Sequence, residues 1–379
     1  MQENHTLHIP GMQFEPENYQ QQLRDKASIV LQRLSRFALP ETKIFNSPKL
    51  NFRMRAEFRI WHSYDENDNS FCHYAMFEKS APKTPVRIDD FPIAHQSISE
   101  LMQPLLRLIN QNETLRKKLF QIEFLSSTTG DLLISLIYHK ALEDTWIAEA
   151  KNLETKLNVA IIGRSRKQRL VLSKDAIKEK LQIGETTFTY LQPENSFSQP
   201  NAVINLQMIE WLVDYLESNS SLKQSDLLEM YCGNGNFSIA LAKYFRKVLA
   251  TEISKTSIKF AQKNCALNNI HNVEFIRLSG EETASALRAE RAFRRLSHID
   301  LAEYDLDCVL VDPPRAGLDT QSLAFTQSFN TILYISCNPE SLAENLDTLS
   351  KTHSVAKFAL FDQFPYTDHC ECGVILERK

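Results

Sequence analysis

Regular alternation between strands and helices in the C-terminal half of the chain constrains the fold more than any other feature of the sequence. From about residue 191, short apolar runs of strand length alternate with longer helical patterns. Strands that alternate with helices form a parallel sheet with helices on both faces. We therefore predict an α/β fold for this half. The expected strands are 226–231, 247–252, 273–278, 308–312, 331–336, 355–361 and 373–377, and the expected helices are 237–245, 255–268 and 339–352.

The link between the last two expected strands is too short for a parallel crossover. Residues 362–372 have no helical pattern, whereas a parallel connection usually contains a helix. The last strand should therefore run antiparallel to its neighbours, which gives six parallel strands and an antiparallel seventh. Ligands of open α/β sheets bind at the carboxyl ends of the parallel strands, so we expect the functional site at this edge.

The N-terminal half has a different pattern. Residues 51–61 alternate between apolar and charged side chains, which predicts a strand with one buried side and one cationic side. The cationic side carries Arg53, Arg55 and Arg59. Helices are expected at 19–37 and 96–110, and further strands at 119–126, 131–138 and 159–163. A chain of 379 residues exceeds the usual size of one core, and we predict an α+β domain over 1–190 followed by the α/β domain over 191–379.

Charge is distributed unevenly between the two halves. The whole chain has a formal net charge of −4. Residues 1–190 hold 26 Lys and Arg against 23 Asp and Glu, whereas 191–379 hold 17 against 24, so the halves carry +3 and −7. The densest positive cluster comprises Arg164, Arg166, Lys167, Arg169 and Lys174. Such a cluster can neutralise phosphates or form an ordinary solvated face, and charge alone does not distinguish the two.

Cysteine usage and hydropathy indicate an ordinary intracellular protein. Seven cysteines, an odd number in a long chain, favour free thiols over a disulfide framework. Cys370 and Cys372 beside His369 are too few for a convincing metal site, and we expect no metal. The first residues lack the pattern of a signal peptide, and no apolar stretch is long enough to span a bilayer. We expect a cytoplasmic protein without membrane association, and a monomer.

A glycine-containing turn follows the first expected strand of the α/β domain. Gly233 and Gly235 lie between this strand and a helix, where the backbone can approach a ligand closely. A dinucleotide fingerprint needs a third glycine three residues later, but Ser238 occupies that position, so a nicotinamide dehydrogenase is poorly supported. Glu252 ends the next strand, where a carboxylate can accept hydrogen bonds from ribose hydroxyls. A tight turn with a surface acid is the alternative interpretation.

Two further strands end in unusual sequences at the same edge. The fourth strand continues into Asp312-Pro-Pro-Arg315, in which the prolines impose a rigid, extended exit. The fifth strand ends at Ser336, and Cys337 leads directly into a turn. An antiparallel last strand would begin at this edge and bring Glu371 close to Cys337. A buried structural cysteine is the alternative interpretation of Cys337.

Four motifs together resemble those of the RNA uridine-5-methyltransferase family, whose catalytic domain has the Rossmann-like, seven-stranded class I methyltransferase fold. They are Phe-x-Gln-x-Asn at 197–201, Asp-Pro-Pro-Arg-x-Gly-Leu at 312–318, Ser-Cys-Asn-Pro at 336–339 and Asp-x-Phe-Pro-x-Thr-x-His-x-Glu at 362–371. Residues 54–62 and 118–122 resemble the branch of the family that acts on tRNA. We find no TRAM domain and no four-cysteine iron–sulfur motif, which the rRNA branches often carry.

This resemblance implies an enzyme that transfers a methyl group from S-adenosyl-L-methionine to C5 of a uridine in the T loop of tRNA, at position 54, and also in the tRNA-like part of tmRNA. It implies that Cys337 is the nucleophile that adds to C6 of uracil and that Glu371 is the base that removes the C5 proton. Asp362 also matches the family motif and is a candidate for ordering the target base. The positions that match the family's cofactor residues are Gln199, Tyr231, Asn236, Glu252 and Asp312.

The resemblance also implies that the N-terminal domain binds RNA. Single-stranded RNA is recognised by stacking splayed bases on aromatic rings or guanidinium groups. The candidate residues are Arg53, Arg55, Arg59, Phe120 and His139, although Phe120 is equally compatible with a core position. Three alternative functions are left open: the same chemistry on rRNA, an RNA-binding or RNA-folding module with incidental catalysis, and an adenine amino-methyltransferase, which Arg315 after the prolines disfavours.

Overall fold

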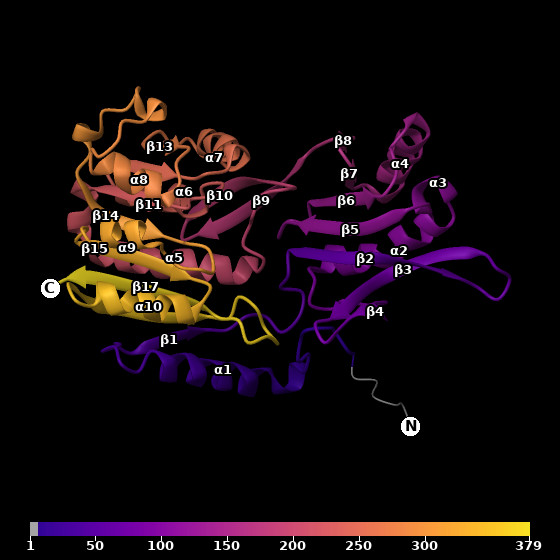
Figure 1. Cartoon of the computed structure of the whole chain (residues 1–379), viewed down its shortest axis with the longest axis horizontal. Coiled ribbons are helices and arrows are strands. Elements are labelled where there is room, and N and C mark those ends of the chain that lie inside the picture. The colour runs from indigo at the N-terminus through magenta and orange to yellow at the C-terminus, as the bar shows by residue number, and fades with distance from the viewer. Residues whose placement is uncertain (1–6) are drawn as a thin grey trace.

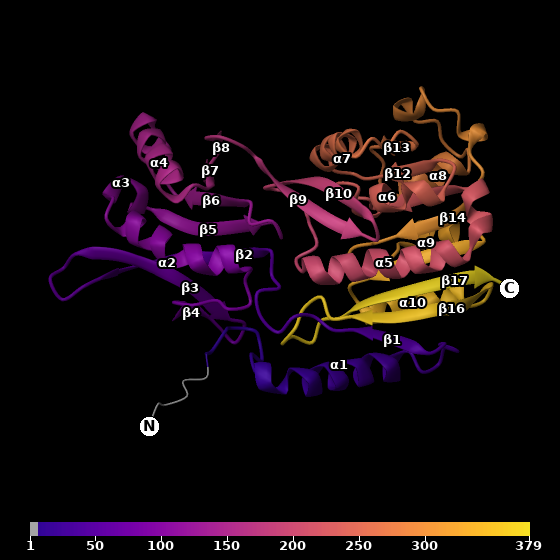
Figure 2. The same ribbon diagram turned by 180° about the vertical axis from the view of Figure 1, so that it is seen from behind.

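Two large sheets dominate the computed structural model, which describes residues 7–379. An eight-stranded sheet lies mainly in the C-terminal half and a seven-stranded sheet in the N-terminal half. The hairpin of β9 (Ala176–Ile183) and β10 (Thr186–Pro193) lies between them (Figures 1 and 2). The described part of the chain contains no helix long and apolar enough to cross a membrane.

The C-terminal sheet confirms the predicted α/β architecture. Its strands are β1 (Thr42–Phe45), β11 (Asp226–Met230), β12 (Val248–Thr251), β13 (Val273–Ile276), β14 (Leu306–Val311), β15 (Thr331–Ser336), β16 (His353–Phe361) and β17 (Glu371–Arg378). The spatial order is β1-β16-β17-β15-β14-β11-β12-β13. All neighbours pair in parallel except β17, which is antiparallel to both β15 and β16. β17 begins two residues before the predicted start, because Glu371 already pairs with Phe361 of β16.

Both faces of this sheet are buried. Consecutive strand residues point to opposite sides, so Leu227 belongs to one hydrophobic cluster and Leu228 to the other. Burial on both faces explains why the strands are apolar without alternation. The α-helices are α5 (Ala202–Ser218), α6 (Asn236–Leu241), α7 (Lys255–Leu267), α8 (Gly280–Leu287), α9 (Thr320–Thr326) and α10 (Pro339–Leu349), and the short 3-10 helices are η2 (Ser220–Gln224), η3 (Ala242–Tyr244), η4 (Arg294–Leu296) and η5 (Leu301–Glu303). The prediction lacks α5, α8 and α9.

The N-terminal sheet is mostly antiparallel. Its strands are β2 (Arg55–Tyr64), β3 (Ser70–Glu78), β4 (Ala81–Arg87), β5 (Leu119–Ser126), β6 (Leu132–Tyr138), β7 (Ala160–Ser165) and β8 (Gln168–Val171), in the spatial order β4-β3-β2-β5-β6-β7-β8. Only the β6–β7 pair among these is parallel. β2 begins at Arg55 and not at residue 51, since Arg53 instead forms isolated bridges with Ala94 and Asn201.

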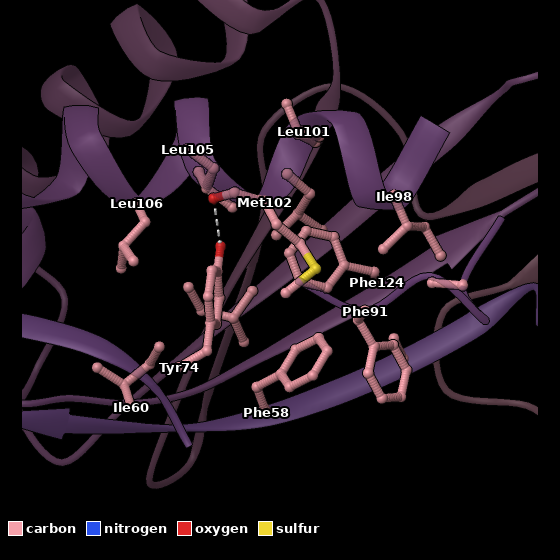
Figure 3. Close-up of a cluster of buried hydrophobic side chains, with 14 of the residues drawn as sticks. Phe58, Ile60, Tyr74, Phe91, Ile98, Leu101, Met102, Leu105, Leu106 and Phe124 are labelled. Carbon is pink, nitrogen blue, oxygen red and sulfur yellow. Dashed lines mark hydrogen bonds between the residues drawn. The ribbon is translucent and has the colours of Figure 1, made fainter. Parts of the chain in front are cut away.

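Helices cover one face of the N-terminal sheet. They are α2 (Gln96–Asn110), α3 (Glu113–Arg116) and α4 (Asp144–Leu157). Apolar side chains of α2, such as Ile98 and Met102, pack against Phe58 and Phe124 of the sheet (Figure 3). The hydroxyl of Tyr74 donates a hydrogen bond to the carbonyl of Met102 at 2.9 Å in this core. Part of the opposite face packs against Ile177 of β9, and no helix within the described residues covers the remainder.

Parts of the N-terminal half pack on the C-terminal sheet. β1 pairs with the edge strand β16, and α1 (Tyr19–Arg33), which follows the short 3-10 helix η1 (Pro16–Asn18), lies beside α10 (Figure 1). Val30 of α1 shares a hydrophobic cluster with Leu346 of α10, and Phe188 and Tyr190 of β10 join the cluster on the other face. The packing therefore differs from a single boundary at residue 190, because these apolar side chains complete the core of the later domain.

Candidate active site

The turn after β15 presents Cys337 at the carboxyl edge of the sheet. Among the cysteines of residues 7–379, Cys337 is half-buried and the other six are buried. Asn338 caps α10 by accepting a hydrogen bond from the backbone N–H of Glu340 at 3.0 Å. Its Nδ2 donates to the carbonyl of Arg315 at 2.9 Å. The turn that carries Cys337 and the Asp-Pro-Pro-Arg turn are thus held together directly.

Glu371 lies beside Cys337, as the antiparallel last strand predicts. Ser336 pairs with Cys372 across β15 and β17, which brings the residues next to this pair together. Burial raises the pKa of Glu371 well above its ordinary value, and the charge of Asp312 raises it further. Burial likewise raises the pKa of Cys337 to about 11, with contributions from the charges of Glu371 and Asp312. Cys337 is therefore a thiol in the free protein at neutral pH.

A cavity lies at the carboxyl ends of these strands. Its lining includes Gln199, Tyr231, Asn236 and Asp312, so four of the five predicted cofactor residues meet there. Glu252 contacts the backbone of the glycine turn. Its carboxylate accepts hydrogen bonds from the backbone N–H of Gly233 at 3.1 Å and from that of Ser254 at 2.7 Å.

The glycine turn leaves room for a ligand. Gly233 has a φ of +56°, and a Cβ at this position would meet no atom within 4 Å. Tyr231 also adopts a positive φ of 66°. Its ring lines the cavity while its hydroxyl lies close to Gly280, where a Cβ would approach it to 2.4 Å. Tyr231 therefore combines a cavity position with a packing role.

Polar contacts connect the cofactor candidates to one another. Gln199 donates from Nε2 to Oδ2 of Asp312 at 3.4 Å. The amides of Asn236 and Asn205 exchange two hydrogen bonds, at 2.8 and 2.9 Å. Burial raises the pKa of Asp312 to about 7. A cationic ligand group would favour the ionised form of Asp312, so the donor set, the open Gly233 and the two acids fit S-adenosylmethionine, which carries a sulfonium and ribose hydroxyls.

A separate cleft of about 720 Å³ includes Cys337 in its lining. Arg315 and Asn338 line this cleft together with Cys337. Gln22 and Arg33 of α1 also line it. Its volume is within the range that accommodates a nucleotide-sized ligand. The N-terminal helix thus forms one side of the cleft, although the sequence assigns that helix to the other domain.

Three of the RNA-binding candidates form one stack on the open face of the N-terminal sheet. The guanidinium of Arg59 lies 3.8 Å from the ring centroid of Phe120. The rings of Phe120 and His139 are stacked, with centroids 3.9 Å apart. Arg59 and His139 are exposed and Phe120 is half-buried, so Phe120 does not occupy the core.

Arg53 and Arg55 have different surroundings from Arg59. The Nε of Arg53 donates to the carbonyl of Arg55 at 2.8 Å. Arg55 donates to Ser198 Oγ at 2.9 Å and to the carbonyl of Ser196 at 2.5 Å. The predicted cationic face is therefore divided, because Arg53 bonds within its own segment, and the segment before Gln199 accepts the hydrogen bonds of Arg55.

The basic cluster after α4 is partly neutralised. Arg164 and Arg169 both form ion pairs with Glu194, whose side chain is only 2% exposed, each at 3.2 Å. Lys174 pairs with Asp131. Arg166 and Lys167 lie exposed in the turn between β7 and β8. The ion-paired residues of this cluster therefore stabilise the fold, and only Arg166 and Lys167 present their charge outward.

Sequence reasoning missed three polar residues around the site. Asn205 holds the amide of Asn236, and Gln363 donates a hydrogen bond to Gln199. Lys26 of α1 forms a buried ion pair with Asp362 at 2.6 Å. The available signal was the position of Lys26 on the otherwise apolar face of a predicted helix, where a charge requires a partner.

Comparison with known proteins identifies the family. The family described as "tRNA (Uracil-5-)-methyltransferase" matches residues 18–379. The chain belongs to this family. Relatives named "tRNA/tmRNA (uracil-C(5))-methyltransferase" include those of Colwellia psychrerythraea, which is 50% identical over 96% of this chain and 98% of that protein, and of Ectopseudomonas mendocina, which is 49% identical over 97% and 99%. The predicted membership of the uridine-5-methyltransferase family is therefore confirmed.

A solved structure supports the fold of this uracil-5-methyltransferase family member. It is the Pyrococcus abyssi tRNA (uracil-54, C5)-methyltransferase in complex with S-adenosyl-L-homocysteine. The TM-score is 0.69 at 22% identity, and the match covers 95% of this chain and 83% of that one. The class I methyltransferase architecture predicted for the chain is confirmed.

Proposed function

We propose that this protein is an S-adenosylmethionine-dependent tRNA (uracil-5-)-methyltransferase that modifies the T-loop uridine at position 54. The observation that carries the proposal is that β15 and β17 bring Cys337 and Glu371 together at one sheet edge, where Cys337 lines the cleft beside α1 and the cofactor candidates line a second cavity. The names of the relatives, which include tmRNA, extend the proposed substrates to the tRNA-like part of that molecule.

Five side chains are proposed to hold the cofactor. Asp312 and Gln199 lie at the end of the cavity nearest Cys337, Tyr231 and Asn236 form its lining, and Glu252 supports the glycine turn. When bound, S-adenosylmethionine supplies an electrophilic methyl group on a positively charged sulfur. The cofactor chemistry suits a target whose C5 has first been made nucleophilic.

Cys337 is proposed to make C5 nucleophilic. After the thiol has lost its proton to water, the thiolate forms a bond to C6 of uracil, and the electrons of the C5=C6 bond move toward C5 and the O4 carbonyl. After C5 has gained the methyl group, Glu371 takes the C5 proton. The C–H electrons restore C5=C6, the C6–S bond breaks, and its electrons return to the sulfur as thiolate. The cysteine is regenerated and no other reactant is needed.

The electrostatics of the site suit this sequence of steps. Because the pKa of Cys337 is raised to about 11, the thiolate is rare in the free protein. Arg315, which lines the same cleft, lowers the pKa of both Cys337 and Glu371. Glu371 has a raised pKa through burial, and a carboxylate with a high pKa is a stronger base. Glu371 is therefore suited to proton removal, and the charge of Arg315 favours the loss of the Cys337 proton that must precede addition.

Recognition of the T arm is assigned to the stack of Arg59, Phe120 and His139. The exposed Arg59 guanidinium and the exposed His139 ring each stack on Phe120, and a splayed loop base can stack on the outer plane of either group. The target uridine must leave its stack before Cys337 can reach C6. We further propose a monomer acting on tRNA in the cytoplasm.

The decisive experiment is nucleoside mass spectrometry of RNA treated with the purified protein and S-adenosylmethionine. Unmodified tRNA transcript should gain one 5-methyluridine, and a transcript with cytidine at position 54 should gain none. Methylation of rRNA transcripts in place of tRNA would support the rRNA alternative. RNA refolding without any methylation would support the RNA-folding alternative.

A further inference from the structure

A buried ammonium group connects the first helix to the loop that precedes Glu371. Lys26 lies on α1, and its side chain is 8% exposed. Its Nζ donates to Oδ1 of Asp362 at 2.6 Å, to the carbonyl of Phe364 at 3.0 Å and to the carbonyl of His369 at 3.0 Å. An ammonium has three donors, so every donor of Lys26 is used within this one loop.

The three acceptors span the loop between β16 and β17. Asp362 is the first residue after β16, and His369 lies two residues before Glu371, where β17 begins. Figure 2 labels both strands. Tyr19 of α1 adds a second contact, because its hydroxyl donates to Oδ2 of Asp362 at 2.8 Å. Both carboxylate oxygens of Asp362 are thus bonded to α1.

We propose that Lys26 is a positioning residue for methylation: it fixes the backbone before Glu371 so that this carboxylate faces the adduct on Cys337. The inference rests on the proposed function, in which Glu371 is the base. Lys26 acts through the loop and does not touch the reacting atoms. It lines the same cleft as Cys337 and His369, so its effect is local to the site.

Stability alone does not explain a lysine at this position. A buried ion pair is seldom more stabilising than apolar side chains of similar volume. The neighbouring inward positions of α1 carry Leu23, Ala27 and Val30, so an apolar residue would pack there too. An apolar residue could not bond the carbonyls of Phe364 and His369. Those two bonds fix the path of the loop, and a displacement of about 1 Å at a catalytic group can reduce the rate about 10²-fold.

The test compares Lys26→Met with Arg246→Met in the full-length protein. Arg246 pairs at 2.5 Å with Asp226, whose side chain is fully buried. Asp226 begins β11, so this pair lies at the amino ends of the parallel strands, away from the site at their carboxyl ends. Both variants remove the cation from a buried carboxylate, but only Lys26→Met releases the loop. Each variant is assayed for kcat on tRNA, KM for S-adenosylmethionine, thermal midpoint, and the fraction of protein joined covalently to methylated tRNA on a denaturing gel.

Lys26→Met should lower kcat about 10²-fold and accumulate methylated adduct, because proton removal becomes slower than methyl transfer. Its KM for S-adenosylmethionine should stay within about twofold of wild type, since the cofactor cavity is lined by other residues. Arg246→Met should lose thermal stability without accumulating adduct. Normal turnover by folded Lys26→Met, or an equal loss of kcat without adduct in both variants, overturns the proposal.

Two further variants keep the test decisive. If Lys26→Met does not fold, the double variant Lys26→Met/Asp362→Asn removes both charges and leaves no unpaired buried carboxylate. Low kcat with trapped adduct in the folded double variant supports the proposal, and wild-type kcat overturns it. Glu371→Gln is the reference for the proposed function. If it turns over normally, the assignment of the base fails; if it traps adduct and the Lys26 variants do not, only the role of Lys26 fails.

Discussion

The two sheets of this protein use their polar side chains in different places. In the C-terminal sheet, Asp312 and Cys337 follow the ends of neighbouring parallel strands, and both lie at one edge. In the N-terminal sheet, Arg59 and Phe120 lie on the open face of antiparallel strands, where contact depends on which residues the register sets side by side. A parallel sheet therefore gathers distant residues at strand ends, whereas an antiparallel face gathers them through pairing.

This difference affects how each region should respond to substitution. The edge site contains the groups that we propose form and break bonds, so losing one of them should stop a chemical step. The face site contains groups that only stack, so losing one should weaken recognition by the energy of a single stacking interaction. The following predictions test that contrast, from the largest expected effect to the smallest.

Replacement of the nucleophile should have the largest effect. Cys337→Ala removes the thiolate that activates C5, so 5-methyluridine formation should fall at least about 10³-fold. Binding of S-adenosylmethionine, measured by calorimetry, should persist because its proposed contacts lie on other strands. Cys265→Ala, a buried cysteine of α7, is the matched control and should retain activity. Methylation by Cys337→Ala at a measurable rate would contradict the covalent mechanism.

Replacement of the base should stop the reaction one step later. Glu371→Gln keeps the shape of the side chain but cannot take the C5 proton, so turnover should fall about 10²- to 10⁴-fold. Methylated tRNA should then accumulate in a covalent complex with Cys337 that survives a denaturing gel. Normal turnover without this complex would exclude Glu371 as the base.

The half-buried thiol of Cys337 should react slowly with alkylating reagents. A pKa near 11, two units above the ordinary value of 9.0, gives roughly a hundredfold less thiolate at neutral pH. Alkylation of native protein by iodoacetamide at pH 7.5, followed by intact mass, should therefore be about a hundredfold slower than for free cysteine, and it should accelerate as the pH rises toward 11. Cys337→Ala serves as the blank, since the remaining cysteines are buried. Rapid alkylation at pH 7.5 would contradict the raised pKa.

Loss of the aromatic stack should have a moderate effect. One stacked base contributes about 1–3 kcal/mol, so Phe120→Ala should lower kcat/KM for an isolated T-arm hairpin about tenfold or more. The salt dependence of binding should stay unchanged, because no phosphate-binding group is removed. Trp61→Ala, an exposed aromatic of the same sheet outside the stack, is the control. If Phe120→Ala and Trp61→Ala lowered kcat/KM equally, the stack would have no specific role in T-arm recognition.

Removal of the two exposed cations should have the smallest effect. Arg166→Ala/Lys167→Ala should weaken binding to any folded RNA and reduce the slope of log K against log salt by roughly 0.7 to 0.9 for each phosphate that the protein no longer neutralises. Lys223→Ala, an exposed cation near the opposite edge of the C-terminal sheet, should leave the slope unchanged. An unchanged slope in the double variant would exclude the β7–β8 turn from the RNA interface.

The sequence by itself determined the α/β fold and most of the edge site. Alternating strand and helix patterns specify a parallel sheet, and residues that directly follow such strands must lie at one edge. The short link after β16 made β17 antiparallel, and this alone brought Glu371 to Cys337. Both conclusions depend on local patterns within the chain and on the geometry of one sheet, so no knowledge of long-range packing was needed.

The tertiary structure alone decided which distant segments complete the site. β1 joins the C-terminal sheet, and α1 forms one side of the cleft because it packs on both cores: Leu23 lies in the N-terminal cluster and Val30 in the C-terminal one. Arg55 and Arg59 follow the same alternation in sequence, yet one bonds a crossing segment and the other stacks on Phe120. A period-two pattern specifies a face of a strand, but only the packed fold determines which segment lies against that face.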